Sequence, residues 1–193
     1  MLHVHYWDPH TPYRTPADYE SRFQDMPLPD DWITEDIFKE HLLHIGPHGA
    51  NEINMWNDDT FKQWPKHPGR LETKEAAKHL IDLYDDGVRY TDDNIGMILD
   101  YLKEKGLYDE DVAIIITADH GEDLGEFGGY GEHGMADEPV CRIPMIIKWP
   151  GVEGGRHVNG FHDNVDLLPT VQELLGTERF GSYHYDGVSY AGT

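Results

Sequence analysis

The sequence has 193 residues and a formal net charge of −22, from 15 lysines and arginines against 37 aspartates and glutamates. This length suits one domain with a buried core, and so acidic a surface disfavours nucleic acid and anionic membranes as partners. No stretch is apolar for long enough to span a membrane, and a single cysteine, Cys141, excludes an internal disulfide and a cysteine metal cluster. An anionic substrate would need a local positive site on this chain, most simply a metal ion.

A proline-containing loop follows the first six residues. It runs from Trp7 to Tyr13 and carries His10 between two prolines. Stiff backbone of this kind can hold a polar side chain in place for a contact with a ligand. The alternative is a loop histidine that only packs on a neighbouring aromatic ring.

Residues 14–70 form the least regular part of the chain, because prolines interrupt them repeatedly. A short helix is expected over residues 34–43, with Thr34 as its N-cap. We expect the region as a whole to be a substrate-side insertion that lies over the functional site. The histidines of this region fit no metal-binding spacing and are expected on the surface: His41, His44, His48 and His67.

Regular structure becomes clear from Glu72, where apolar residues recur at steps of three and four. This period predicts an amphipathic helix ending at Gly106, with a break or kink near residues 85–87. Its many aspartates are expected on the solvated face: Asp82, Asp85, Asp86, Asp92 and Asp93. The apolar run at residues 112–116 then predicts a strand buried on both faces. A helix that leads into a buried strand is typical of an α/β fold.

Asp119 and His120 come directly after this strand, at its carboxyl end, where ligands bind in open α/β sheets. Their side chains offer a carboxylate oxygen and an imidazole nitrogen, both common metal ligands. Taken alone, the pair is better interpreted as a strand that ends in a polar turn. A glycine-rich segment follows, and we expect it to fold back and present His133 beside the pair. The alternative is a mobile loop whose histidine is incidental.

The last part of the chain predicts a further buried strand within residues 141–149, with Cys141 at its start. A helix is expected after it, capped by Asp166 and ending at Gly176.

Taken together and in this order, these segments resemble the sulfatases of the alkaline phosphatase superfamily. Each match is moderately specific, whereas the order and spacing of the set are highly specific. The region 14–70 shows little match. The matching segments are His5–Tyr13, Tyr84–Gly96, Thr117–Glu122, Arg142–Pro144 and Val165–Thr170.

The resemblance implies an α/β fold with three layers, a mostly parallel sheet flanked by helices, present here in incomplete form. It implies a sulfuric ester hydrolase that is metal-binding, with Asp119 and His120 as metal ligands. His10 and His133 would be catalytic and substrate-binding residues that contact the sulfate group. Counting from the two flanking motifs puts either Glu132 or His133 at the last position, and His133 is preferred because a carboxylate would repel an anion.

The family's metal is usually calcium, which prefers oxygen ligands, so the nitrogen of His120 leaves manganese or zinc open. The formylglycine nucleophile and two further aspartates expected of the family have no counterpart in this sequence, since Cys141 precedes Arg-Ile-Pro instead of the family's C-x-P-S-R order. We therefore expect residues 1–193 to be a single domain, the later part of a sulfatase catalytic domain. The full-length parent would be the enzyme, and the isolated chain would be inactive.

Two alternatives stay open: a phosphodiesterase or phosphonate monoester hydrolase of the same superfamily, and a truncated, non-catalytic binding module. The expected partner is a small-molecule or carbohydrate sulfate ester, with no nucleic acid and no membrane. Exposed sheet edges would also favour self-association. The sequence does not indicate a cellular compartment.

Overall fold

The computed structural model describes residues 1–19, 22–28, 33–46, 48–53, 69–109, 112–177 and 184–192. They form two compact units, residues 1–147 and residues 148–193. Among the described residues, no helix combines the length and the apolar character that crossing a bilayer requires. The organisation of residues 1–193 as one catalytic domain stays a prediction.

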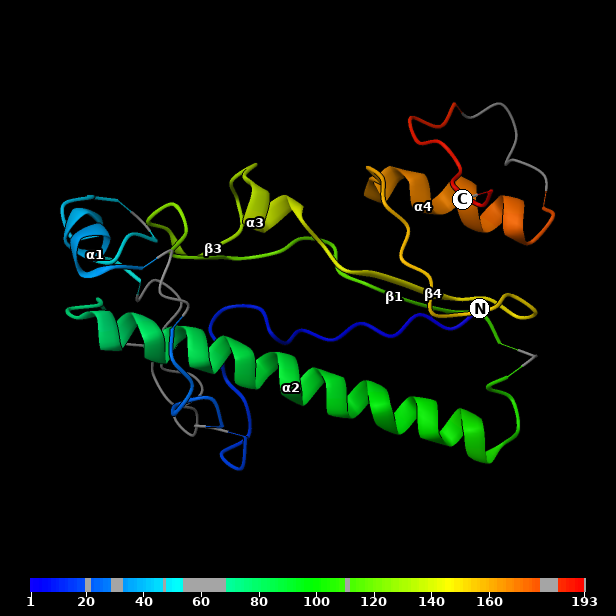
Figure 1. The fold of residues 1–193 in the computed structure, drawn as a ribbon, viewed down its shortest axis with the longest axis horizontal. Coiled ribbons are helices and arrows are strands. Elements are labelled where there is room, and N and C mark those ends of the chain that lie inside the picture. Colours follow the sequence, from blue (N-terminus) through cyan, green and yellow to red (C-terminus); the bar gives the residue numbers. More distant parts are fainter. Residues whose placement is uncertain are drawn as a thin grey trace. The chain divides into compact units, whose positions relative to one another are not determined.

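The longest element of the first unit is helix α2, Lys74–Glu104, with 31 residues (Figure 1). It confirms the helix predicted from the apolar period. The Thr73 hydroxyl caps it by accepting a hydrogen bond from the Ala76 amide at 3.2 Å. The helix continues through residues 85–87 without interruption, so the expected break there was wrong.

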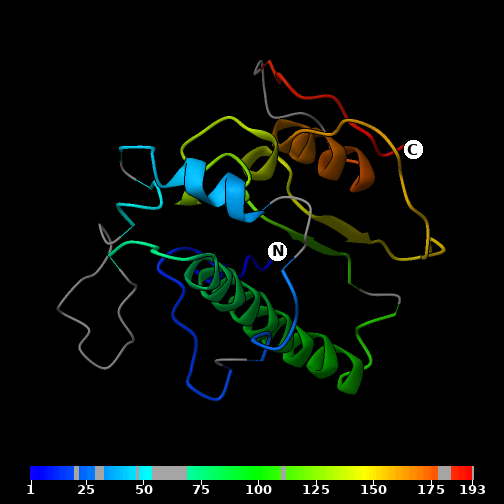
Figure 2. The ribbon, with the colours of Figure 1, turned by 60° about the vertical axis from the view of Figure 1, so that its left-hand side comes forward.

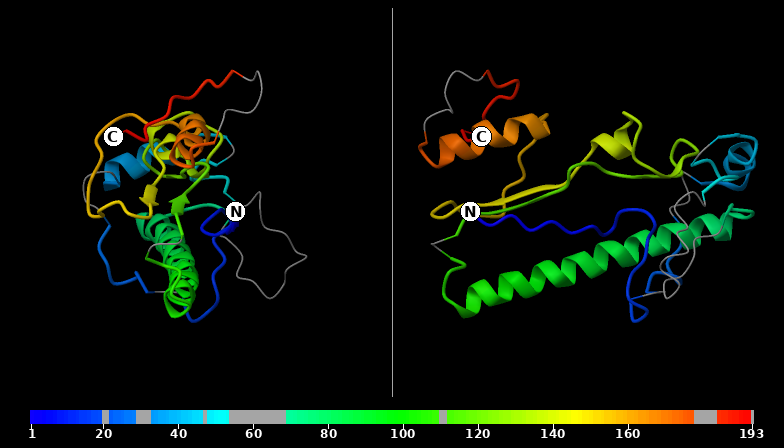
Figure 3. Two further views of the ribbon diagram at one scale, coloured as in Figure 1. Left: turned by 90° about the vertical axis from the view of Figure 1, so that its right-hand side faces the viewer. Right: turned by 180° about the vertical axis from the view of Figure 1, so that it is seen from behind.

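The acidic side chains of α2 are not all on its solvated face. Asp86 is fully buried and Asp82 is 7% exposed, which corrects the expectation for these two residues. Lys78 compensates the charge of Asp82, with its Nζ 2.6 Å from Oδ2. The same part of the helix lies against the proline loop: a Cβ atom added to Gly87 would lie 3.0 Å from Cβ of Pro9. Both views in Figure 3 show the N-terminal segment beside α2.

The apolar core of the first unit lies where the N-terminal half of α2 meets α1, Glu35–His41, and the hairpin described next. Helix α1 confirms the predicted short helix, and its N-cap is Thr34, whose hydroxyl accepts from the Ile37 amide at 3.2 Å. Figure 2 shows α1 next to the hairpin. The core residues are Tyr13, Ile33, Phe38, Ala50, Ile53, Leu71, Ala77, Leu80, Ile81, Leu124 and Tyr130.

In the part of the chain that the structure describes, four short strands form two small sheets. Strand β1, Ile114–Thr117, pairs with β4, Met145–Lys148, while β2, Asp123–Leu124, forms an antiparallel hairpin with β3, Tyr130–Glu132. The predicted central strand is confirmed as β1, but its burial on both faces was wrong. Its apolar residues are only half-buried, and Ile146 on β4 is 59% exposed. The reason is that β4 is the one neighbouring strand that β1 has within the described residues.

A short helix, α3, Glu138–Cys141, connects the hairpin to β4. Asp137 caps it, with Oδ1 accepting from the Val140 amide at 3.2 Å. Cys141 is therefore the exposed last residue of a helix and not the first residue of a buried strand, as was expected. The strand itself begins at Met145.

The second unit is built around helix α4, Asn164–Leu174. The predicted helix is confirmed, but its N-cap is Asp163, and Asp166 lies one turn inside and accepts from the Asp163 amide at 2.9 Å. Asp166 also accepts from the Val188 amide at 2.7 Å, and Thr170 Oγ1 accepts from the Tyr190 amide at 3.1 Å. These two bonds attach the C-terminal tail to α4.

Candidate functional site

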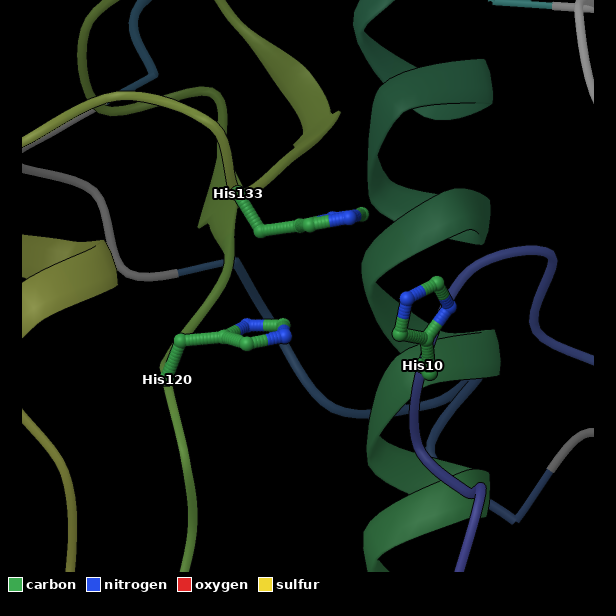
Figure 4. Close-up of side chains that lie close together, drawn as sticks. All are labelled: His10, His120 and His133. Atoms are coloured by element: carbon green, nitrogen blue, oxygen red, sulfur yellow. The ribbon is translucent and has the colours of Figure 1, made fainter.

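Three histidines from separate loops of the first unit converge at one place. One ring nitrogen from each of His10, His120 and His133 lies within 4.8 Å of the corresponding nitrogens of the other two. The ring of His133 stacks on that of His120, with centroids 4.8 Å apart, and lies 4.6 Å from the ring of His10. Figure 4 shows the two stacked rings pointing toward His10, which projects from the N-terminal loop in front of α2.

His10 is held by its own loop and by α2. Its Nδ1 lies 2.5 Å from the Thr11 carbonyl oxygen, and since a carbonyl only accepts, Nδ1 carries the proton. The His10 ring also packs on the Trp7 ring, with centroids 4.3 Å apart. The alternative role, packing on an aromatic neighbour, is therefore fulfilled by the same ring that lies in the site. The Thr91 hydroxyl on α2 donates to the Asp8 carbonyl at 3.1 Å, which attaches the loop to the helix. The remaining nitrogen of His10, Nε2, is left for the site.

Asp119 and His120 lie on the turn after β1, as predicted. His120 donates from Nδ1 to the Gly121 carbonyl at 2.8 Å, which leaves Nε2 to accept a proton or a metal ion. The Asp119 carboxylate accepts from the His120 amide at 3.1 Å, and its side chain is 78% exposed. Its Oδ1 lies 3.9 Å from His120 Nε2, so one turn presents an oxygen and a nitrogen ligand side by side.

The turn depends on the absence of a side chain at Gly121. A Cβ atom there would lie 2.0 Å from the Pro139 carbonyl oxygen, and the Gly121 amide donates to the Val140 carbonyl at 2.6 Å. This close approach to α3 fixes the backbone next to His120.

The glycine-rich segment folds back on this turn, as the sequence suggested, and it brings His133 rather than Glu132 to the other two histidines. The Glu132 carboxylate points elsewhere: it lies 3.3 Å from His48 Nε2 and accepts from the Gly134 amide. Burial lowers the pKa of His133, and nearby His10 and His120 lower it further. His133 Nδ1 lies 3.6 Å from Oε1 of Glu122.

Glu122 belongs to the site although sequence analysis gave it no role. It is 8% exposed, and this burial raises its pKa to about 8 against the opposing effect of the Tyr13 hydroxyl. Burial also raises the pKa of Tyr13 well above its usual value, with the charge of Glu122 adding to the effect. The only sequence signal for Glu122 was its place two residues after His120.

Two histidines of the region 14–70, His41 and His48, contact β3, which corrects their expected place on the surface. His41 is 7% exposed, with Nδ1 2.8 Å from the Tyr130 hydroxyl, and His48 pairs with Glu132. The Tyr130 amide donates to the His48 carbonyl at 2.7 Å, so this segment packs directly on β3. His44 is exposed as expected, and His67 lies outside the described residues.

Comparison of the sequence with known proteins identifies a matching family. The family model described as Sulfatase matches residues 1–177. The chain is 30% identical over 180 residues to the "Multifunctional alkaline phosphatase superfamily protein PehA" of Trinickia caryophylli, across 92% of this chain and 34% of that protein.

Two solved structures are similar as well. The phosphonate monoester hydrolase SpPMH from Silicibacter pomeroyi superposes with a TM-score of 0.69 at 29% identity, covering 95% of this chain and 35% of that one. BT4656, solved in complex with its substrate D-glucosamine-2-N,6-O-disulfate, superposes with a TM-score of 0.54 at 30% identity, covering 63% of this chain and 25% of that one.

The chain therefore spans about one third of the length of PehA and SpPMH. The structural neighbours confirm the predicted fold class, because they share an α/β architecture of alkaline phosphatase type with this chain. The family model, covering residues 1–177, supports the same conclusion. On these grounds the chain belongs to the sulfatase family of the alkaline phosphatase superfamily.

Proposed function

We propose that this chain supplies part of the active site of a metal-dependent sulfuric ester hydrolase. The observation that carries the proposal is the convergence of His10, His120 and His133 at the carboxyl end of β1. Family membership supports the reaction class, and the disulfated glucosamine named as the substrate of BT4656 supports a sulfated carbohydrate as substrate.

Asp119 and His120 would hold the divalent metal. The chemistry of this pair fits: an accessible carboxylate adjoins an imidazole whose Nδ1 is already occupied by the Gly121 carbonyl, so Nε2 is available. We propose calcium, with manganese or zinc as alternatives because one ligand is nitrogen. Such an ion, when bound, neutralises charge on the sulfuryl oxygens.

His10 and His133 would contact the sulfate group. The Nδ1 proton of His10 is held by the Thr11 carbonyl, so a second proton on Nε2 can pass to the leaving oxygen. His133, on the same side as His120, offers a hydrogen bond to the sulfuryl oxygens. Burial keeps Glu122 protonated at neutral pH, since its pKa is about 8, and this removes a negative charge that would repel the anion.

The nucleophile has to come from another part of the full-length parent. Cys141 does not suit the role, because it lies at the exposed end of α3 and lacks the family's C-x-P-S-R context. Turnover is therefore proposed for the full-length parent, and the 193-residue chain alone is expected to be inactive.

The test is His10→Ala in the full-length parent, assayed for kcat on an aryl sulfate. Loss of a proton donor lowers turnover by roughly 10²- to 10⁴-fold, while the far-UV circular dichroism spectrum stays the same. His79→Ala is the matched control, because His79 is an exposed histidine on α2. Equal turnover in wild type and His10→Ala would remove His10 from the reaction.

A phosphonate monoester hydrolase is the second candidate. It is favoured by SpPMH, whose similarity extends over 95% of this chain, compared with 63% for the BT4656 complex. Measuring kcat/KM of the parent for an aryl sulfate and an aryl phosphonate side by side decides between the two. A higher value for the phosphonate would favour this candidate over the sulfatase.

A further inference from the structure

We infer that His10, His120 and His133 together form a binding site for one zinc-class transition metal ion, with three imidazole nitrogens as ligands. This site differs in its ligands from the Asp119–His120 pair proposed above, although it shares His120. The inference uses the geometry of the described residues and does not depend on the proposed hydrolysis.

The spacing of the nitrogens is close to what such an ion needs. Zinc takes imidazole nitrogens at about 2.0–2.1 Å in tetrahedral geometry, which places two such nitrogens about 3.4 Å apart. The three nitrogens already lie within 4.8 Å of one another. An approach of up to about 1.4 Å, which rotation about side-chain bonds can supply, completes the geometry.

Two of the three rings also have a second partner of the kind that metal-bound histidines use. His10 and His120 direct Nδ1 to the carbonyl oxygens of Thr11 and Gly121, at 2.5 and 2.8 Å. His133 Nδ1 lies 3.6 Å from Oε1 of Glu122, which is too far for a hydrogen bond. The two hydrogen bonds leave Nε2 of His10 and His120 as ligand atoms and restrict the orientation of these two rings, so the rotation that completes the geometry is expected mainly at His133.

The ligand set selects the ion. Three imidazoles suit zinc, copper and nickel, whereas calcium and magnesium prefer oxygen. The net charge of −22 favours the approach of any cation, so the nitrogen ligands have to supply the selectivity. If the proposed function holds, an ion here would occupy His10 and His133 and inhibit hydrolysis.

The experiment titrates the 193-residue chain with zinc chloride by isothermal calorimetry, and with cobalt chloride by visible absorption. We expect one ion per chain and cobalt bands typical of low coordination number. His10→Ala and His133→Ala should each lower zinc affinity roughly tenfold or more, with His79→Ala unchanged. Asp119→Asn should lower zinc affinity less than either histidine variant does, because its carboxylate is not one of the three ligands.

Three results would overturn the inference: no stoichiometric zinc binding, equal affinity in wild type and both histidine variants, or an equal loss in Asp119→Asn. The last would assign the ion to the Asp119–His120 pair. Should a variant lose its native circular dichroism spectrum, imidazole ¹⁵N NMR of the wild-type chain replaces it. Zinc should then shift the signals of His10, His120 and His133, and unshifted signals would refute the site. Turnover of the parent, which tests the proposed function, is measured independently.

Discussion

The protonation state of Glu122 is set by its burial beside the three histidines. It is nearly buried, lies 3.6 Å from His133, and has a pKa raised to about 8 by that burial. A charged carboxylate at this place would favour the protonated form of the neighbouring histidines, and it would repel an anionic substrate. The neutral form avoids the second effect, so the environment of Glu122 suits an anion-binding site.

The raised pKa of Glu122 makes the stability of the chain depend on pH. Between its ordinary value of 4.5 and about 8 the folded chain holds this proton and the unfolded chain releases it. The free energy of unfolding therefore falls as pH rises through this window. Glu122→Gln cannot ionise, so its stability should not fall in this window, and its stability relative to wild type should be higher at pH 8 than at pH 5.

Urea denaturation at pH 5 and pH 8, with a chelator present to remove metal ions, measures the difference. Glu153→Gln, at an exposed position in the second unit, is the control and should follow wild type. Parallel pH profiles for Glu122→Gln and wild type would contradict the assignment.

Asp119 allows a second test at the level of one residue. In the full-length parent, Asp119→Asn removes a charged oxygen ligand and should lower calcium affinity roughly tenfold or more. Elemental analysis after dialysis measures the metal retained. Asp100→Asn, with a 77% exposed side chain on α2, controls for the loss of one surface charge. Unaltered calcium content in Asp119→Asn would argue against its role as a ligand.

Helix α2 supports the site, because the loop that carries His10 packs on its middle turns. At Gly87 the loop and the helix come close together, with Pro9 atoms 3.0 and 3.3 Å from an added Cβ. Gly96, two to three turns further on, has no atom within 4 Å of an added Cβ. A side chain at Gly87 would therefore collide with the loop, whereas a side chain at Gly96 would meet no neighbouring atom.

The contrast predicts opposite effects for one substitution. Gly96→Ala should stabilise the chain by about 0.8–1 kcal/mol through helix propensity. Gly87→Ala should destabilise it by about 1–3 kcal/mol, because the methyl group pushes the proline loop away from α2. Thermal unfolding of both variants beside wild type measures the effect. A higher melting temperature for Gly87→Ala would show that the loop is not held by this contact.

At the level of the whole molecule, two features have opposite effects on self-association: the exposed apolar surface of the strands and the high negative charge. Ile146 on β4 is 59% exposed, in a sheet of two strands, and unpaired strand edges favour association between copies. The net charge of −22 opposes association through repulsion, which salt screens.

We therefore expect the chain to self-associate with a strength that increases between 0.05 and 0.5 M sodium chloride, a range of roughly threefold in Debye length. Ile146→Lys should weaken the association, because a lysine on an edge strand opposes pairing. Ile45→Lys is the control, at a 98% exposed position outside the sheets. Sedimentation velocity measures the mass. A monomer at every salt concentration would exclude association through this edge.

Sequence alone determined the features that depend on local pattern. The apolar period of three and four identified α2, and the β-branched run identified β1. The position of Asp119 and His120 on one turn was also predictable from local sequence. Adjacent residues that follow a strand share a turn, whatever the rest of the chain does.

Only the tertiary structure decided what depends on contacts between distant segments. It put His133 rather than Glu132 beside His10, because Glu132 pairs with His48 from the insertion region. The burial of Asp86 depends on what packs against α2, which no helical period can reveal. The turn after β1 was predictable because Asp119 and His120 are neighbours in sequence, whereas the three-histidine cluster depends on how three separate loops fold onto one another.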